Sequence, residues 1–411
     1  MIRKSLTLFL FLSSIFICAQ RNTSSPYSIF GVGEEFSTKT VEQISMGGIG
    51  AAFGSDRYLN FINPAANSNL TYATYVFGLL NNDLRVRSLD FDQTTSTTSL
   101  SYFALGIPLS PKVGFTFGMQ PTSAVGYSLR NSIFDDEDNL IDLTTFSGTG
   151  SVTRLYTGFG WNFWKGFSIG AEIDFLFGNL QNSITNSRIN VDLSTRNVEI
   201  TDIRGGSVKV GAHYQGKLKN EVDISIGATA TLENTLRATG DEYLYSVIFD
   251  TAGGESPRDT IFQGDLNGRL LRPLKTVLGG GIGKKDKWYA GINYSYQDAF
   301  QNSGYFNNSN NAYIYDSSSS ISIGGFYLPK INSLSSYWQR VTYRLGMKYE
   351  QTGLLVNGTP GSNTFTGIDD FGISFGLGLP LGNRVSNINF AGEIGRRGTL
   401  NNGLIQENYF N

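Results

Sequence analysis

Long stretches of this chain alternate between apolar and polar residues. In residues 167–178, FSIGAEIDFLFG, the odd positions are all apolar and the even positions are mostly small or charged, Glu172 and Asp174 among them. Residues 222–233 repeat the pattern. A period of two predicts a β-strand with one apolar and one polar face. Several stretches reach ten residues or more, the length that a tilted strand needs to cross a bilayer.

The composition agrees with β structure and excludes two other classes. Aromatic residues make up 13% of the chain and charged residues only 16%, whereas soluble domains average about 25% charged residues. Disordered chains are charged and poor in aromatic residues, so this chain is not one of them. After residue 20 no run of about 18 apolar residues is present that could cross a bilayer as a helix.

The first twenty residues predict export from the cytoplasm. Arg3 and Lys4 precede an apolar stretch, residues 6–17, and Ala19 provides a small residue for cleavage, which is the pattern of a signal peptide. Cys18 is the only cysteine, and Ile17 before it is too large for a lipoprotein signal. The mature chain then contains no disulfide or reactive thiol. No basic tract suggests nucleic acid as a partner.

Thirteen alternating stretches predict strands, and a fourteenth begins near Gly403. Short links, such as 217–220 and 382–383, alternate with longer polar stretches at about 121–146, 181–200, 234–270, 298–314 and 351–368. Outer-membrane barrels have this alternation of short periplasmic turns and long extracellular loops. We therefore predict an all-β fold: a transmembrane antiparallel up-and-down β-barrel of about 14 strands. The thirteen strands are expected at about 71–80, 98–108, 112–121, 147–163, 166–179, 203–217, 221–234, 273–283, 287–297, 317–328, 338–351, 369–380 and 384–397.

A soluble β-sandwich or a periplasmic barrel would alternate as well. There the apolar face would form a packed core, and the strands would be shorter. The strand length, the low charge, the predicted signal peptide and the aromatic residues near predicted turns, such as Trp161 and Trp288, favour the membrane barrel. A shift by one residue would move Glu172 and Asp174 into lipid, at a cost of up to a few kcal/mol near the midplane, so these two residues are expected to face the lumen.

Residues 21–70 precede the first predicted strand and carry recognisable motifs. They contain SPYSIFGVGE (25–34), SMGGIGAAFG (45–54) and the tripeptide Asn63-Pro64-Ala65. Later segments include GMQPTSAVGYSL (118–129), GGFYLPK (324–330), VTYRLGMKYE (341–350) and GLIQENYF (403–410). With these segments, nearly the whole mature chain resembles the FadL/TodX-type outer-membrane transport family, and in particular its uncharacterised branch from Bacteroidota.

The resemblance implies a 14-stranded barrel whose N-terminal segment folds into the lumen as a hatch, and uptake of hydrophobic small molecules, long-chain fatty acids being the best-known class. It places Asn63, Pro64 and Ala65 in the hatch. The expected domains are a signal peptide (1–20), the hatch segment (21–70) and the outer-membrane barrel (71–411).

A hatch is also expected on physical grounds. A barrel of about 14 strands has a lumen wider than its own side chains fill. Gly47, Gly48 and Gly50 would allow the backbone to pack closely or turn sharply against the wall. The alternative is that these glycines form a flexible periplasmic lead-in.

The lumenal face is expected to hold the hatch and line a water channel, and it offers little chemistry. With one histidine and one cysteine, zinc binding and Cys/His catalysis are excluded in practice, and we expect no enzyme activity, metal or cofactor. His213 is a solvated lumen residue or, in the alternative, a proton switch. The acidic run 135–138 lacks the glycine and spacing of a calcium loop. The residues expected to line the lumen are Glu172, Asp174, His213, Arg340, Arg344, Lys348, Glu350 and Glu393.

Two functions remain open. The first is an outer-membrane channel that takes up hydrophobic or amphipathic small molecules and is gated by the hatch. The second is an interaction protein, because the family also includes a barrel that serves type IX secretion. The expected partners are outer-membrane lipid and lipopolysaccharide, a hydrophobic small-molecule cargo, the barrel-assembly machinery and, for the second function, secretion-system components.

The last predicted strand is short. Only about eight residues follow Gly403, whereas a strand needs about 9–11 residues to cross the bilayer. Backbone groups left unpaired in lipid cost several kcal/mol each. The sequence therefore predicts poor barrel closure or inefficient assembly, which a heat-modifiable, full-yield barrel on a gel would contradict.

Overall fold

The computed structural model describes residues 23–36, 38–89, 91–218, 221–249, 254–306, 312–359, 363–382 and 386–411. The predicted signal peptide, residues 1–20, and parts of the predicted short links at 217–220 and 382–383 lie outside these residues. No helix within the described ranges has the length and apolar character needed to cross a membrane.

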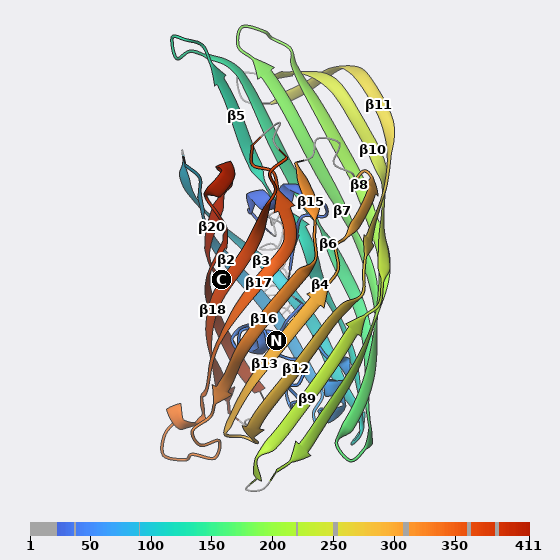
Figure 1. The fold of residues 1–411 in the computed structure, drawn as a ribbon, viewed down its shortest axis with the longest axis vertical. Helices are drawn as coiled ribbons and strands as arrows, with labels where there is room; N and C mark the ends of the chain where they lie inside the picture. Colours follow the sequence, from blue (N-terminus) through green and yellow to red (C-terminus); the bar gives the residue numbers. More distant parts are fainter. Residues whose placement is uncertain are drawn as a thin grey trace, which may run out of the picture.

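Fourteen strands form a closed antiparallel barrel, as predicted (Figure 1). Each strand pairs with its neighbour around the barrel, and the last strand pairs on one side with the strand before it and on the other with the first strand of the wall. The wall consists of β2 (Thr74–Arg87), β3 (Asp92–Ser110), β4 (Val113–Val125), β6 (Leu140–Trp164), β7 (Phe167–Arg188), β8 (Ser194–Lys217), β9 (Asp223–Thr231), β12 (Lys275–Lys284), β13 (Trp288–Gln297), β16 (Ser318–Tyr327), β17 (Thr342–Val356), β18 (Thr366–Leu381), β19 (Ser386–Gly398) and β20 (Gln406–Phe410).

The two faces of each strand are arranged as in a membrane barrel. On β7 the apolar residues Ile173 and Phe175 are 60% and 54% exposed, whereas Glu172 and Asp174 are 1% and 6% exposed. A soluble sandwich would bury the apolar face instead. The outward apolar face and the buried polar face are those of a lipid-embedded wall around a polar lumen.

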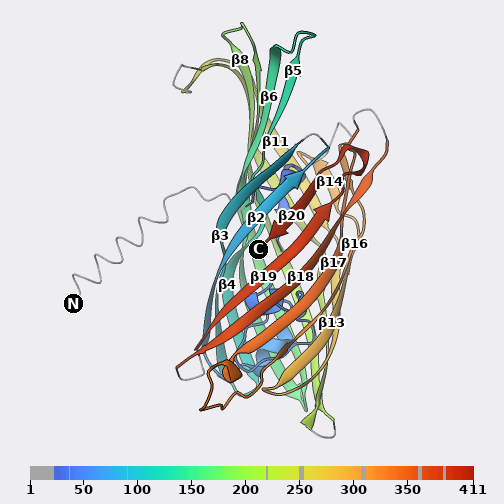
Figure 2. The ribbon, with the colours of Figure 1, turned by 90° about the vertical axis from the view of Figure 1, so that its left-hand side faces the viewer.

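Six further strands lie outside the fourteen, and the three longest of them extend a tall sheet at one end of the barrel (Figures 1 and 2). In this sheet the upper half of β8 pairs with β10, while its lower half pairs with β9. The regions 121–146 and 234–270 were predicted as polar loops, and that prediction is wrong. Both regions contain strands that continue past the barrel rim, where neither face must be apolar. The additional strands are β1 (Glu34–Glu35), β5 (Ser128–Phe134), β10 (Asn234–Phe249), β11 (Glu255–Arg272), β14 (Gln301–Gly304) and β15 (Tyr313–Tyr315).

The short strand β20 closes the barrel, which contradicts the prediction of poor closure. Its five residues pair with residues 394–398 of β19 and with residues 83–87 of β2. Two inward side chains of β20 add polar anchors. Glu407 lies 2.6 Å from the Arg397 guanidinium of β19, which lies equally close to Glu34 of the N-terminal part of the chain. The Tyr409 hydroxyl donates to Asp370 at 2.7 Å. A short strand suffices because these buried contacts hold it to the wall and to the segment inside the barrel.

Replacing Arg397 with leucine should weaken this closure, because Glu34 and Glu407 would stay buried without their cation. Removing one partner of a buried ion pair costs about 3–5 kcal/mol, so the folded band on a heat-modifiability gel should disappear at lower temperature. Arg396→Leu is the matched control, since Arg396 is the adjacent residue of β19 and is exposed. Equal melting of the two variants would show that Arg397 does not support closure.

Candidate functional site

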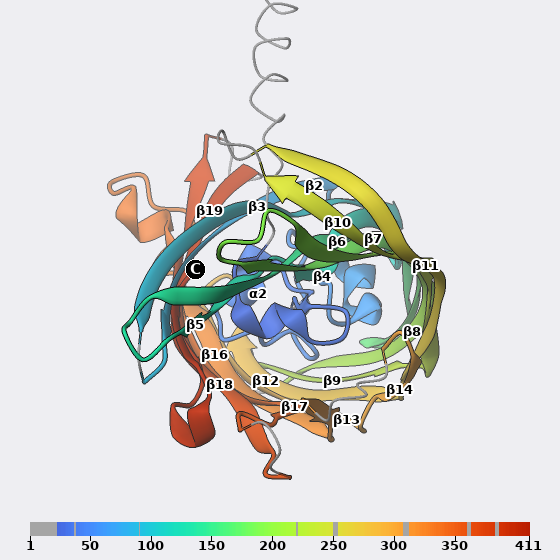
Figure 3. The same ribbon diagram turned by 90° about the horizontal axis from the view of Figure 1, so that it is seen from above.

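Residues 23–70, here called the lumenal segment, fold inside the barrel (Figure 3). Seen from above, the segment lies within the ring of strands, and its side chains are packed: Met46, Ala51 and Ala65 are fully buried. Its elements are the 3-10 turns η2 (Pro26–Ile29) and η3 (Pro64–Asn69), strand β1 and the short helix α2 (Val41–Ile44). The segment therefore occupies the lumen that the wall encloses.

The Asn-Pro-Ala motif starts η3 and ties it to the wall. The Asn63 side chain caps this turn by accepting from the Ala65 amide at 3.0 Å, and Pro64 occupies the first position, where no amide donor is needed. The Asn63 amide also donates to the carbonyl oxygens of Ala51, at 2.7 Å, and of Ala212 on β8, at 3.0 Å. The same side chain thus organises the lumenal segment and joins it to the barrel.

The predicted glycines lie where the lumenal segment turns beside the wall. Gly47 and Gly48 have φ values of 71° and 83°, a region that disfavours other residues. The Gly47 amide donates to the Ser374 hydroxyl of β18 at 2.8 Å. A Cβ on Gly50 would lie 2.4 Å from the side-chain nitrogen Nε2 of Gln43. These positions need glycine for backbone conformation or for close packing.

The wall contributes glycines of its own at the contact, here called the glycine belt. A Cβ on any of them would lie within 2.6 Å of the lumenal segment, in most cases of its backbone. The lumenal segment therefore contacts the wall on many sides at one level of the lumen. Because glycine has no side chain, nothing at the belt positions separates the segment from the wall. The belt consists of Gly114, Gly160, Gly170, Gly211, Gly227, Gly324, Gly346 and Gly376.

A buried ion network joins β6, β7 and β8 to the lumenal segment. Arg154 lies 2.7 Å from Glu172 and 3.1 Å from Asp174, and Lys209 lies 2.6 Å from Glu172. Lys209 also donates to the Phe61 carbonyl of the lumenal segment at 3.1 Å. Buried charges are tolerated when they are paired and hydrogen-bonded, so this network is a structural anchor.

The other residues expected in the lumen lie apart from this ion network. Lys348 pairs with Asp370 and with Glu393, at 3.2 and 2.9 Å, and Glu350 is half-buried on the same face of β17. The buried His213 ring nitrogen Nε2 lies 3.0 Å from the Ala52 carbonyl. Arg340 lies outside the strand, in the 3-10 turn Trp338–Arg340, where its guanidinium contacts the Tyr337 ring.

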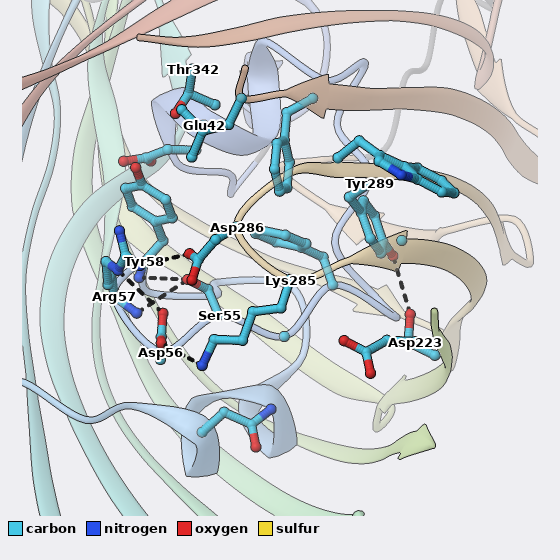
Figure 4. Close-up of a pocket in the computed structure, with 18 of the residues that line it drawn as sticks. Glu42, Ser55, Asp56, Arg57, Tyr58, Asp223, Lys285, Asp286, Tyr289 and Thr342 are labelled. Carbon is cyan, nitrogen blue, oxygen red and sulfur yellow. Dashed lines mark hydrogen bonds and ion pairs between the residues drawn. The ribbon is translucent and has the colours of Figure 1, made fainter. Parts of the chain in front are cut away.

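A cavity of about 320 Å³ lies between the lumenal segment and the wall (Figure 4). It is near the β12–β13 turn, at the end where outer-membrane barrels face the periplasm. One side is aromatic: the Tyr289 ring centroid lies 5.1 Å from Phe53 and 6.2 Å from Phe326. The other side is polar and contains Glu42 and Arg344. Small-molecule sites of about 300–1,000 Å³ commonly combine such surfaces.

Ion pairs cross from the lumenal segment to the β12–β13 turn at this cavity, and we call them the latch. Arg57 lies 2.7 Å from Asp286, and Lys285 lies 3.0 Å from Asp56 (Figure 4). Hydrogen bonding to Asp56 raises the pKa of Lys285. Because these side chains are partly exposed, each pair contributes at most about 1 kcal/mol. The latch is therefore a weaker connection than the buried network around Glu172.

Of the residues predicted for the lumen, only Arg344 lines this cavity. Sequence reasoning did not identify Glu42, Phe53, Tyr289 or the latch. The sequence contains the adjacent charged residues Asp56-Arg57 and Lys285-Asp286, but nothing in it indicates that one pair contacts the other. Within the described ranges, no group of three or more His, Cys, Asp or Glu side chains is placed to hold a metal ion.

An alanine at Gly346 should displace the lumenal segment. Its Cβ would lie 2.2 Å from the Gly47 amide nitrogen, and such overpacking costs about 1–3 kcal/mol. We expect a higher ion conductance in planar bilayers. Gly280→Ala is the control, since a Cβ there would meet nothing within 4 Å. If both variants conduct like the unmodified protein, the belt does not hold the segment in place.

Solved structures show the same fold at low sequence identity. A Pseudomonas aeruginosa FadL homologue matches with a TM-score of 0.62 and 12% identity, over 92% of this chain and 98% of that one. The Pseudomonas putida toluene transporter TodX and the Ralstonia pickettii toluene transporter TbuX match with TM-scores of 0.55 and identities of 15% and 13%, each over 92% of this chain and 96% of the other. These matches confirm the predicted barrel fold, which this chain shares with the FadL homologue and the two transporters.

The sequence itself identifies the family. A comparison with curated proteins finds no match. One family model matches over residues 1–411, and its description is BamG. Because this match covers the whole chain, the protein belongs to the BamG family.

Proposed function

We propose that the protein is an outer-membrane channel that takes up hydrophobic or amphipathic small molecules, with the lumenal segment as its hatch. In this proposal residues 1–20 are a signal peptide, residues 21–70 form the hatch and residues 71–411 form the barrel. The two toluene transporters named above, which share the fold, support a cargo of this kind. The cargo and the surrounding lipid and lipopolysaccharide are the proposed partners.

The observation that carries the proposal is the way the lumenal segment fills the barrel. It touches the glycine belt around the wall, yet it leaves a cavity with aromatic and charged sides at the short-turn end. A purely structural plug would have no need for such a space. Cargo would pass when the segment shifts, and the partly exposed latch would release before the buried network does.

A disulfide between the lumenal segment and the wall should stop uptake. The hydroxyl oxygens of Ser68 and Ser168 are 2.9 Å apart, so cysteines at both positions can be bridged, and the chain's only native cysteine is Cys18. In proteoliposomes the oxidised Ser68→Cys/Ser168→Cys variant should take up toluene at least about tenfold more slowly than the reduced form, because the hatch can no longer shift.

A disulfide within the wall is the matched control. The hydroxyl oxygens of Ser295 on β13 and Ser320 on β16 are 2.8 Å apart, so Ser295→Cys/Ser320→Cys adds the same bond without crossing to the lumenal segment. Its uptake should not depend on oxidation. If the oxidised Ser68→Cys/Ser168→Cys variant takes up toluene as fast as the oxidised control variant, the hatch does not move during uptake.

The tall sheet at the other end favours a second candidate, an interaction protein. Its strands expose Ile133, Phe134, Ile261 and Phe262, each at least half exposed, and exposed apolar groups of this kind occur at protein interfaces. The family name also hints at the barrel-assembly machinery. The partners in this second candidate are components of the barrel-assembly machinery or of a secretion system.

Purification from native membranes separates the two functions. An interaction protein should co-purify in stoichiometric amounts with assembly or secretion components, and its deletion should leave the uptake of small hydrophobic molecules unchanged. A channel should give the reverse pattern: no stoichiometric partner and an uptake defect.

A further inference from the structure

The link between β16 and β17, residues 328–341, lies outside the barrel at its short-turn end. Seen from above, the link projects beyond the ring of strands, and seen from the side it lies at the level of the other short turns (Figures 1 and 3). It contains the 3-10 turn η5 (Trp338–Arg340). The link therefore neither covers the lumen nor adds a strand to the wall.

Hydrogen bonds fasten the link to itself and to the wall. The Lys330 amide donates to the Gln339 carbonyl at 2.8 Å, which closes the base of the link. The Tyr337 hydroxyl donates to the Pro380 carbonyl of β18 at 3.2 Å. The link consequently has a defined shape at the rim and lies against a strand other than the two that it joins.

The link turns apolar side chains away from the protein. Leu334 is 96% exposed, the highest exposed fraction of any large apolar residue that the structure describes, and Trp338 is 64% exposed. Contact between apolar surface and water is unfavourable, in rough proportion to the area that is exposed. These two side chains therefore need apolar surroundings that the described part of the chain does not provide.

The neighbourhood of the link favours a lipid surface over a protein. The link continues directly from the lipid-facing wall: on β17 the outward Leu345 is 64% exposed, and the Tyr343 hydroxyl of the same face donates to the Trp338 carbonyl at 3.2 Å. Lys330 is exposed, and Arg340 lies at the other end of the link. Tryptophan and tyrosine together with lysine and arginine are the residues that proteins place at the level of the lipid headgroups.

We propose that residues 328–341 form an interfacial anchor, which lies in the headgroup region of the periplasmic leaflet. Leu334 and Trp338 enter the boundary between headgroups and acyl chains, and Lys330 and Arg340 bind the phosphate groups of phospholipids. The anchor is a lipid-binding surface separate from the lumen, and lipid contact there does not depend on the proposed channel.

The anchor begins beside the cavity and the latch. Leu328 lines the cavity, and its amide donates to the Lys287 carbonyl at 2.6 Å. Lys287 belongs to the β12–β13 turn, which carries the latch residues Lys285 and Asp286. If the proposed hatch moves, the anchor holds this turn at one level of the bilayer while the lumenal segment shifts. This consequence rests on the proposed function, whereas the anchor itself does not.

A spin label at the tip of the link tests the anchor. The full chain carries Leu334→Cys in a Cys18→Ser background, and it is reconstituted into vesicles of phosphatidylethanolamine and phosphatidylglycerol. A water-soluble nickel chelate should relax this label at least about tenfold more slowly than a label on Asp136→Cys, at the exposed tip of the β5–β6 hairpin, because a polar solute is excluded from the apolar boundary. Oxygen should relax it as it relaxes the lipid-facing reference Leu345→Cys.

A second substitution removes the other apolar contact. Adding Trp338→Ser to the labelled chain should raise the nickel relaxation rate by about tenfold. The matched control Phe134→Ser removes an exposed ring from the tall sheet and should leave the rate unchanged, while heat-modifiable migration verifies that each variant is folded. Equal nickel relaxation of the labels at 334 and 136 would overturn the anchor. Protection from nickel in native outer membranes but not in vesicles would also overturn it, because a protein would then cover the link.

Discussion

The structure depends on one rule of the bilayer interior: every backbone N–H and C=O group must find its partner within the protein. A sheet satisfies this rule only by closing on itself, and here β20 joins β19 to β2. Closure then assigns the two faces of each strand. The side chains that alternate outward are apolar and meet lipid, while Glu172, Asp174 and Lys209 are enclosed in the lumen.

Closure with fourteen strands creates a second requirement, because such a lumen is wider than its own side chains fill. The lumenal segment meets this requirement, and the wall receives it through glycines instead of large side chains. Close backbone contact excludes water from much of the interface, so the remaining charges must pair. The Arg154–Glu172–Lys209 network and the Arg397–Glu407 pair do so, whereas Glu42 and Arg344 form no ion pair with any described residue, since Asn389 lies between them.

Outside the bilayer the rule no longer applies, and the wall changes character. The strand β8 shows the transition: its lower half pairs with β9 inside the barrel, and its upper half pairs with β10 in the tall sheet. Water can satisfy the edges of that sheet, so it needs no closure. The same molecule therefore presents a sealed wall to lipid and an open sheet beyond it.

The amino-acid sequence by itself determined the barrel, the approximate positions of its strands and the inward face of residues such as Glu172, because alternation with a period of two is a local property. It did not reveal β10 and β11, since strands outside lipid lack a strictly apolar face. The sequence did not reveal the cavity either. Glu42, Asn389 and Arg344 are far apart in the chain, and only the docking of the lumenal segment against β17 and β19 brings a carboxylate, an amide and a guanidinium to one place.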